Sequence, residues 1–169
     1  LFAPTLKPLS GRDPTAVIDS TASVDPTAAV GPYAVIGPDA AIGPHTIVGP
    51  GCVIGQGTVV GARCQLDANV VIYHFCRIGD DCVIQANATI GSVGFGYVFI
   101  DGQHRLIPHN GGVILENGVE IGAGTGIDRA KFGNTVIGAG TKIDNLVPIG
   151  KNGRNGKACL LAGQNGLSG

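Results

Sequence analysis

The sequence predicts an all-β fold, a parallel β-helix made of short stacked strands, and three observations lead to this prediction. An aliphatic residue recurs every six positions, a small residue stands two positions before it, and a Gly or Pro often follows it. The chain has 169 residues, 44% of them hydrophobic, which suffices for one domain with a continuous core. Its 29 glycines and 10 prolines would suit a disordered chain, but the strict period indicates an ordered repeat.

The six-residue period runs without interruption through the first half of the chain. Its aliphatic members are Ile18, Val24, Val30, Ile36, Ile42, Val48, Ile54, Val60, Leu66, Ile72, Ile78, Ile84 and Ile90. The residues two positions earlier are Ala22, Ala28, Ala34, Ala40, Thr46, Cys52, Thr58, Cys64, Val70, Cys76, Cys82 and Ala88. Residues two apart on a strand share a face, so both positions should point inward. A six-residue unit cannot bury its own apolar side, so units must stack, with a rise of about 4.8 Å per coil.

The positions after each aliphatic residue predict corners between strands. Proline stands there at Pro26, Pro32, Pro38, Pro44 and Pro50, in most cases after a Gly. Gly accepts unusual φ values and Pro cannot donate to a sheet ladder, so these dipeptides should turn the chain.

The pattern stops after Ile90 and resumes one residue out of phase at Leu115. Between them, residues 92–112 are predicted to form a loop excursion. Long excursions from a rigid solenoid are usually functional, although a tolerated surface insertion is the alternative. Residues 1–14 are expected to be a linker, and residues 15–169 the β-helix domain.

The period breaks again briefly at the segment DRAKFGN and then runs to Leu167. In this last block the register assigns inward positions to Asn155, Gly153 and Asn165. An inward Asn without a partner costs about 1–3 kcal/mol, so the upper coils should pack less well than the lower ones.

Charge and hydropathy exclude several functions. The formal net charge of -1 favours neither nucleic acid nor an anionic membrane as a partner. No apolar run approaches the roughly 18 residues of a transmembrane segment, and the first residues lack a signal-peptide core. We therefore expect an intracellular protein, cytoplasmic or, if it comes from a plant, organellar.

The five cysteines all occupy the small inward position of the repeat. They are Cys52, Cys64, Cys76, Cys82 and Cys159. This placement predicts buried thiols that act as small hydrophobic side chains. Cys64 and Cys82 are 18 residues apart and should be vertical neighbours, which an intracellular compartment would keep reduced.

Three segments carry a resemblance to a known family. They are GSVGFGYV from Gly91, VEIGAGTGIDR from Val119 and TKIDNLVPIGKN from Thr141. Together they resemble the UDP-3-O-acylglucosamine N-acyltransferases of lipid A biosynthesis, which are hexapeptide-repeat acyltransferases. The resemblance implies a left-handed β-helix with three sides per coil, and homotrimers with sites between neighbouring prisms. The uridine-binding domain that precedes the β-helix in this family, and the helices that follow it, are not expected in this sequence.

The resemblance also implies a reaction. The family transfers a 3-hydroxyacyl group from acyl carrier protein to the 2-amino group of a UDP-linked acylglucosamine, with no cofactor beyond the carrier thioester. Such a transfer needs a base for the amine and a donor for the oxyanion. The family base is the His of an I-x-H-N segment, oriented by the Asp of I-D-N. Here Asp144, Asn145 and Asn152 match, but Lys151 stands in place of the His and Pro148 in place of a Gln.

Lys151 makes the catalytic prediction ambiguous. An ordinary lysine has a pKa of about 10.4 and is a cation at pH 7, so it cannot accept a proton. Desolvation could lower this value, whereas a nearby Asp144 would oppose the change. The alternative is a non-catalytic trimeric homologue that lost its base. Gly169 follows Lys151 by 18 residues and matches the Gly whose N–H meets the oxyanion, although it could also be an ordinary corner residue.

Further residues match the substrate-binding positions of the family. Gly94, Phe95 and Gly96 match a loop that borders the substrate cleft, unless Phe95 only pins that loop onto the prism. Asp128 and Arg129 match the I-D-R segment, where an ion pair or a trimer contact would be an alternative to substrate binding.

The histidines suggest a third function. His104 and His109 are five residues apart, as are two zinc ligands in the γ-class carbonic anhydrases, which resemble this repeat. However, His74 lies 30 residues before His104, which is not a multiple of 18, so the three do not occupy equivalent positions. No metal is therefore expected. His45 follows a Gly-Pro corner and is expected to be solvated, without a role.

Overall fold

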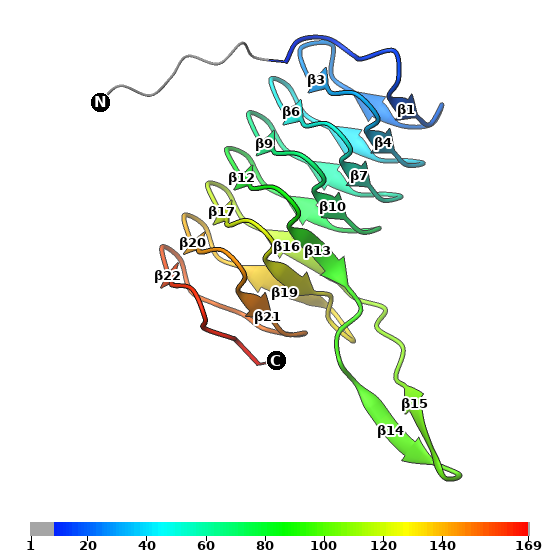
Figure 1. The fold of residues 1–169 in the computed structure, drawn as a ribbon, viewed down its shortest axis with the longest axis vertical. Helices are drawn as coiled ribbons and strands as arrows, with labels where there is room; N and C mark the ends of the chain where they lie inside the picture. The colour runs from blue at the N-terminus through cyan, green and yellow to red at the C-terminus, as the bar shows by residue number, and fades with distance from the viewer. Residues whose placement is uncertain (1–8, 169) are drawn as a thin grey trace.

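The structure is a computed structural model that describes residues 9–168. Its short strands stack into three parallel sheets, which form the three sides of a prism (Figure 1). The chain passes from side 1 to side 2 to side 3 in each coil, as a three-sided parallel β-helix requires. Among residues 9–168, no helix is long and apolar enough to cross a membrane.

The strands of each side follow one another at every third position in the chain. Side 1 comprises β1 (Val17–Ile18), β4 (Val35–Ile36), β7 (Val53–Ile54), β10 (Val71–Ile72), β13 (Thr89–Ser92), β18 (Gly126–Asp128) and β21 (Pro148–Ile149). Side 2 comprises β2 (Ser23–Val24), β5 (Ala41–Ile42), β8 (Val59–Val60), β11 (Arg77–Ile78), β16 (Gly112–Leu115) and β19 (Asn134–Ile137). Side 3 comprises β3 (Ala29–Val30), β6 (Ile47–Val48), β9 (Gln65–Leu66), β12 (Val83–Ile84), β17 (Glu120–Ile121), β20 (Lys142–Ile143) and β22 (Leu160–Leu161).

The register confirms that one coil contains three six-residue units. Ile18 pairs with Ile36, which is 18 residues further along the chain, and this spacing continues to Ile72 and Ile90. The excursion lengthens the next coil, so Ile90 pairs with Ile127. The pairing of Ile127 with Ile149 spans 22 residues because of the DRAKFGN segment. At the beginning of the described chain, Arg12 bridges to Val30, while residues 1–8 of the expected linker lie outside the described part.

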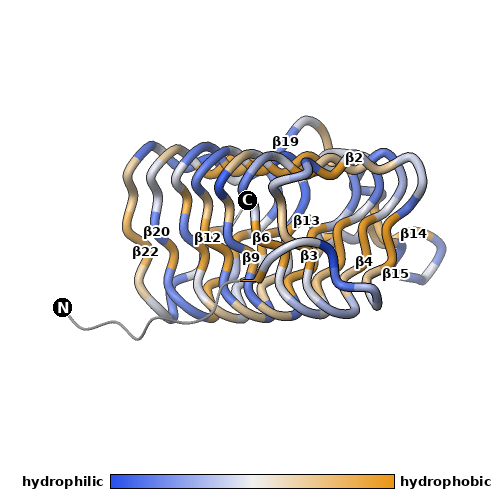
Figure 2. The backbone as a smooth tube through the Cα atoms, turned by 90° about the horizontal axis from the view of Figure 1, so that it is seen from above, coloured by the Kyte–Doolittle hydropathy of each residue, from blue (hydrophilic) through white to orange (hydrophobic). Residues whose placement is uncertain are grey.

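The core follows the predicted positions. The aliphatic residues from Val30 to Ile90 at the six-residue period are at most 3% exposed, and only Ile18 and Val24, in the first coil, are half-buried. In Figure 2 the apolar segments of successive coils line up along the prism. Cys52, Cys64, Cys76 and Cys82 are buried free thiols, whereas Cys159 is half-buried. The prediction of inward thiols is therefore confirmed for the first four.

Corner glycines have a different role from the expected one. The residue with positive φ is the third residue of the corner, for example Tyr33 (58°) and Phe75 (57°); the Gly that follows the aliphatic residue has a positive φ at Gly91 (88°), where the excursion begins, but not in the regular corners. That Gly instead allows close contact between coils. A Cβ on Gly43 would lie 2.7 Å from the carbonyl carbon of Gly61 in the coil above. The repeat therefore needs Gly here for lack of a side chain, and its freedom in φ is not used.

The upper coils pack less tightly, as predicted, because Cys159 and Leu161 are only half-buried. Asn155 nevertheless has partners. Its Oδ1 accepts a hydrogen bond from the Gly138 N–H at 3.1 Å, and its Nδ2 donates to Thr141 Oγ1 at 3.0 Å. Asn165 is exposed, so the prediction that it faces an enclosed interior is wrong, since no further described coil covers it.

The excursion 92–112 contains a hairpin that was not expected from the sequence. Strands β14 (Tyr97–Ile100) and β15 (Gln103–Leu106) pair antiparallel and project away from the prism (Figure 1). Asp101 and Gly102 form the turn, with φ values of 52° and 77°. Asp-Gly between apolar residues is a strong signal for a two-residue hairpin turn of this kind.

Candidate functional site

The loops and most of the motif residues collect on one edge of the prism, where side 1 passes into side 2. Four segments stack there, and we call them together the loop edge: the corner 73–75, the excursion 92–112, the loop 129–133 and the corner 150–152. Backbone hydrogen bonds from Asn110 N to Lys131 O (3.1 Å) and from Gly111 N to Ala130 O (3.0 Å) join the excursion to the loop above it.

Arg129 is the structural centre of the lower part of the loop edge. It is 3% exposed. Its Nε donates to the Gly91 carbonyl at 2.8 Å and its Nη2 to the His74 carbonyl at 2.7 Å, while Nη1 contacts His74 Nε2. The ion pairs among residues 9–168 involve Arg63, Arg105 and Lys142, so the alternative of an Asp128–Arg129 ion pair is wrong. Arg129 instead forms hydrogen bonds that connect three successive coils.

The contact between Arg129 and His74 constrains the imidazole. A guanidinium has no acceptor and stays protonated, so His74 Nε2 must be the acceptor. Burial, and secondarily the positive charge of Arg129, lower the pKa of His74 below its ordinary value. His74 is therefore held in the neutral form in this corner.

Two glycines of the G-F-G segment lie against polar side chains. A Cβ on Gly94 would lie 2.9 Å from Asp128 Oδ2, and a Cβ on Gly96 would lie 3.1 Å from His109 Cε1. Asp128 also accepts a hydrogen bond from Ser92 Oγ at 3.0 Å. The glycines thus allow the excursion to lie directly on Asp128 and His109.

Phe95, between these glycines, points away from the prism. It is 85% exposed and packs edge-to-face on Tyr97, with ring centroids 5.1 Å apart. The alternative that Phe95 pins the loop onto the prism is therefore wrong. Phe95, Tyr97 and His104 line an open hollow of about 420 Å³.

His109, which its spacing from His104 made a candidate zinc ligand, lies in an unusual environment. The residue is 7% exposed, and its Nδ1 lies 2.7 Å from the carbonyl oxygen of Ile107. Its Nε2 is the one buried side-chain nitrogen or oxygen among residues 9–168 that has no hydrogen-bond partner. The sequence contains no local signal for this, because the burial depends on the loop that folds back over the ring.

Lys151 and Asn152 occupy the top of the loop edge. Asn152 has a φ of 59°, a conformation that Asn adopts more readily than most residues. Its Oδ1 accepts a hydrogen bond from Lys131 N at 3.0 Å, and its own N–H donates to Thr135 Oγ1 at 3.0 Å. Lys151 is half-buried next to it. The corner therefore rests on the loop 129–133.

Asp144 and Asn145 lie on a different edge, where side 3 passes into side 1. Asp144 accepts hydrogen bonds from Asn145 N at 2.8 Å and Gly163 N at 2.9 Å, and Asn145 Oδ1 accepts one from Ala123 N at 2.7 Å. A single chain therefore does not bring Asp144 to Lys151. Gly169 lies outside the described residues.

The part of the chain from residue 9 to residue 168 contains no cluster of three or more His, Cys, Asp or Glu side chains that could hold a metal ion. The His74 side chain is hydrogen-bonded to Arg129, and His104 is exposed on the hairpin. His109 is buried where the excursion lies on the prism. The three histidines therefore do not converge as in a zinc site.

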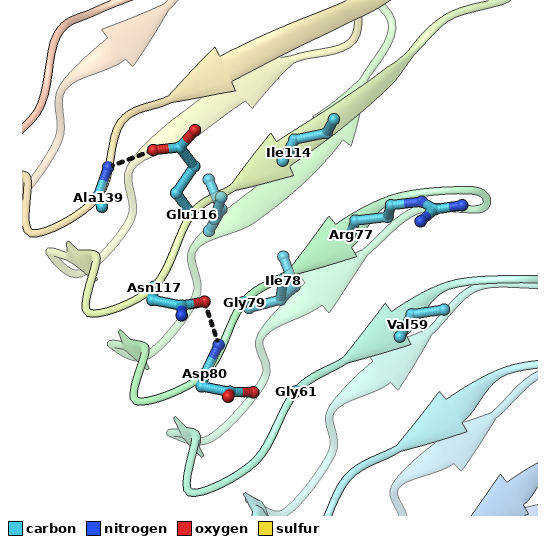
Figure 3. Close-up of a pocket in the computed structure, with 11 residues that line it drawn as sticks. Val59, Gly61, Arg77, Ile78, Gly79, Asp80, Ile114, Glu116, Asn117 and Ala139 are labelled. Atoms are coloured by element: carbon cyan, nitrogen blue, oxygen red, sulfur yellow. Dashed lines mark hydrogen bonds between the residues drawn. The ribbon is translucent and has the colours of Figure 1, made fainter.

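A larger groove of about 550 Å³ lies on side 2 and its edge with side 3 (Figure 3). Its polar side chains cap backbone groups of neighbouring coils. Asn117 Oδ1 accepts a hydrogen bond from Asp80 N at 2.9 Å, and Glu116 Oε2 accepts one from Ala139 N at 2.8 Å. These hydrogen bonds stabilise the stack of coils.

Family models and the fold define the class of the protein. The model described as "Bacterial transferase hexapeptide (six repeats)" matches residues 21–56 and 57–92, and the model "Hexapeptide repeat of succinyl-transferase" matches residues 39–74. The chain thus has the fold of a hexapeptide-repeat β-helix.

Several curated relatives are named UDP-3-O-acylglucosamine N-acyltransferase. That of Legionella pneumophila (strain Paris) is 55% identical over 82 residues, 48% of this chain and 23% of the relative. That of Parasynechococcus marenigrum is 51% identical over 89 residues (53% and 26%), and that of Rhodopseudomonas palustris is 44% identical over 106 residues (63% and 29%). The matched part spans about a quarter of the length of these relatives.

Solved structures agree on the fold. A UDP-N-acetylglucosamine acyltransferase from Campylobacter jejuni has a TM-score of 0.64 and 22% identity, covering 93% of this chain and 67% of its own. A point mutant of AntD, an N-acyltransferase from Bacillus cereus, has a TM-score of 0.54 and 19% identity, covering 86% and 74%. At this identity the likeness shows the shared β-helix alone.

Proposed function

We propose that this protein is an N-acyltransferase of lipid A biosynthesis, which moves a 3-hydroxyacyl group from acyl carrier protein to the 2-amino group of UDP-3-O-acylglucosamine. The observation that carries the proposal is the 44–55% identity to enzymes of that name. The arrangement of the G-F-G, I-D-R and K-N residues along one loop edge supports it.

The proposed reaction forms a C–N bond and breaks the thioester C–S bond. The amine must lose a proton, and the developing oxyanion needs a hydrogen-bond donor. By the resemblance, Lys151 stands at the position of the base, Asn152 matches the Asn beside it, and Gly169 is the candidate oxyanion donor. Gly94, Phe95, Gly96, Asp128 and Arg129 are the candidate substrate-binding residues on the loop edge, with Arg129 acting by holding the loops. No cofactor is required.

We further propose a homotrimer in which the reaction takes place between neighbouring prisms. Asp144 and Asn145 lie on a different edge from Lys151. They can act on the same substrate if one chain supplies the loop edge and its neighbour supplies the Asp144 edge. The partners are then acyl carrier protein and the UDP-linked lipid precursor, which would place the reaction in the cytoplasm or, in a plant, in an organelle.

A second candidate function follows from Lys151. A cationic side chain at the position of the base favours a non-catalytic trimeric homologue that binds the same ligands. The two candidates differ in whether the protein with Lys151 turns over.

The test is an acyl-transfer assay with the carrier-protein thioester and UDP-3-O-acylglucosamine, in which the diacylated product is measured by mass spectrometry. The protein is compared with its Lys151→His variant. Product from the unchanged protein supports the enzyme. Product from the variant alone supports the non-catalytic homologue, and no product from either one overturns the proposed reaction.

A further inference from the structure

The proposed reaction requires a proton acceptor, and the histidines of the described chain differ in their ability to act as one. His45 is exposed on the edge between sides 2 and 3. His104 is exposed on the projecting hairpin. Nε2 of His74 is occupied by Arg129. His109 is the remaining one.

His109 has the arrangement that a general base needs. The carbonyl of Ile107 can only accept, so the proton of the neutral ring must be on Nδ1, and Nε2 carries the free lone pair. A bond that fixes the tautomer and the ring orientation is what positions histidine bases in enzymes. An acceptor buried without a partner costs about 1–3 kcal/mol, and a catalytic role is one of the explanations for such a group.

The position of His109 joins it to the candidate site. A Cβ on Gly96 would lie 3.4 Å from His109 Nε2 and 3.5 Å from Lys131 Cε, so the ring, the G-F-G segment and Lys131 meet at one point. The N–H of the next residue, Asn110, donates a hydrogen bond to the Lys131 carbonyl, and the Lys131 N–H donates one to Asn152 Oδ1. On the loop edge, His109 therefore lies two stacked segments below Lys151.

We propose that His109, and not Lys151, is the proton acceptor of the acyl transfer, and that the substrate amine reaches Nε2 when the Gly94–Gly96 segment moves aside. This rests on the proposed function. The amine nitrogen attacks the thioester carbonyl, and Nε2 takes the proton that the nitrogen loses. When the C–S bond breaks, the same proton passes to the leaving sulfur of the carrier, so the imidazole returns to its neutral form.

Glycine at position 96 supports this role. Any side chain there would contact the imidazole, as the 3.1 Å approach to Cε1 shows. The backbone of Gly96 therefore lies next to the ring, and its carbonyl accepts a hydrogen bond from the Ile107 N–H at 2.8 Å.

The test compares the rate of transfer in His109→Asn with that in the unchanged protein. An Asn amide can keep the hydrogen bond to the Ile107 carbonyl but cannot accept the proton. We expect kcat to fall by about 10²–10⁴-fold with little change in KM. His45→Asn is the matched control and should retain the full rate, because His45 is exposed on another edge. A folded His109→Asn variant with kcat within threefold of the unchanged protein would overturn the proposal.

The pH dependence of the unchanged protein provides a second test, which does not depend on whether the variant folds. An imidazole base gives a kcat that levels off above about pH 7, whereas a lysine base gives one that rises towards pH 10. The first result supports His109 and the second contradicts it. If the unchanged protein forms no product, the proposed function itself fails and this role fails with it, which distinguishes that outcome from an active His109→Asn variant.

Discussion

The guanidinium of Arg129 donates a hydrogen bond of 2.7 Å to the backbone carbonyl of His74, 55 residues earlier in the chain. Together with the bond to the Gly91 carbonyl, it fixes the start of the excursion and the start of the loop 129–133 to the corner below them. Arg129 is a buried cation that binds two carbonyls and an imidazole, and it has no carboxylate partner among the described residues. It therefore holds the segments of the loop edge in fixed positions.

Arg129→Lys should destabilise the protein by about 2 kcal/mol or more, because a lysine cannot serve all three acceptors and leaves buried carbonyls unpaired. The free energy of unfolding in urea measures this effect. Arg105→Lys is the matched control, since the Arg105 side chain is 58% exposed and pairs with Asp101 at 3.5 Å. Its effect should stay below about 0.5 kcal/mol. Equal effects of the two variants would mean that the Arg129 contacts do not stabilise the fold.

Below about pH 6.5, the free energy of unfolding should decrease as the pH decreases, and His74 should account for part of this decrease. The pKa of His74 is lowered in the folded protein by burial and by Arg129, so below that pH the unfolded chain binds the proton more readily. The contribution is complete above about pH 6.5 and is lost as the pH falls towards the folded pKa. Unfolding at pH 7.5 and 5.5 measures it. His74→Gln retains an acceptor but does not titrate, so its loss of stability on acidification should be smaller. A larger loss would contradict the account.

The small hairpin and the Arg129 contacts are parts of the fold that were not expected from the sequence. The period predicted the strands from Val17–Ile18 to Thr89–Ser92, because inward aliphatic residues repeat whether or not their partners are known. The Asp101-Gly102 turn has a local sequence signal, because Asp-Gly favours a two-residue hairpin turn. The orphan nitrogen of His109 had none, since a single sequence does not show how an excursion folds back.

The close contact between coils predicts a difference between two glycines. Gly43→Ala should cost about 1–3 kcal/mol, because its Cβ would lie 2.7 Å from backbone atoms of Gly61. Gly126→Ala, in strand β18, has no atom within 4 Å of the new Cβ and should be neutral or slightly stabilising. Thermal unfolding of both variants checks this. If Gly43→Ala were as stable as Gly126→Ala, the packing argument would be wrong.

Thiol labelling should separate Cys159 from the other four cysteines. Burial raises the pKa of the Cys52 and Cys76 thiols, which disfavours the reactive thiolate. In the folded protein one thiol should react rapidly with a disulfide reagent, and all five should react after denaturation. Cys159→Ser should abolish the fast phase. Rapid reaction of several thiols in the native protein would show that the lower coils, which contain the other four thiols, open readily.

The most direct test of the central claim, that the loop edge is the substrate site, is amide hydrogen exchange of the whole chain with and without UDP-3-O-acylglucosamine. We predict slower exchange in residues 92–112 and 129–133 and in the corner 150–152. The groove around Asn117 in Figure 3 should not change. Protection confined to that groove, or no protection anywhere at saturating ligand, would contradict the account.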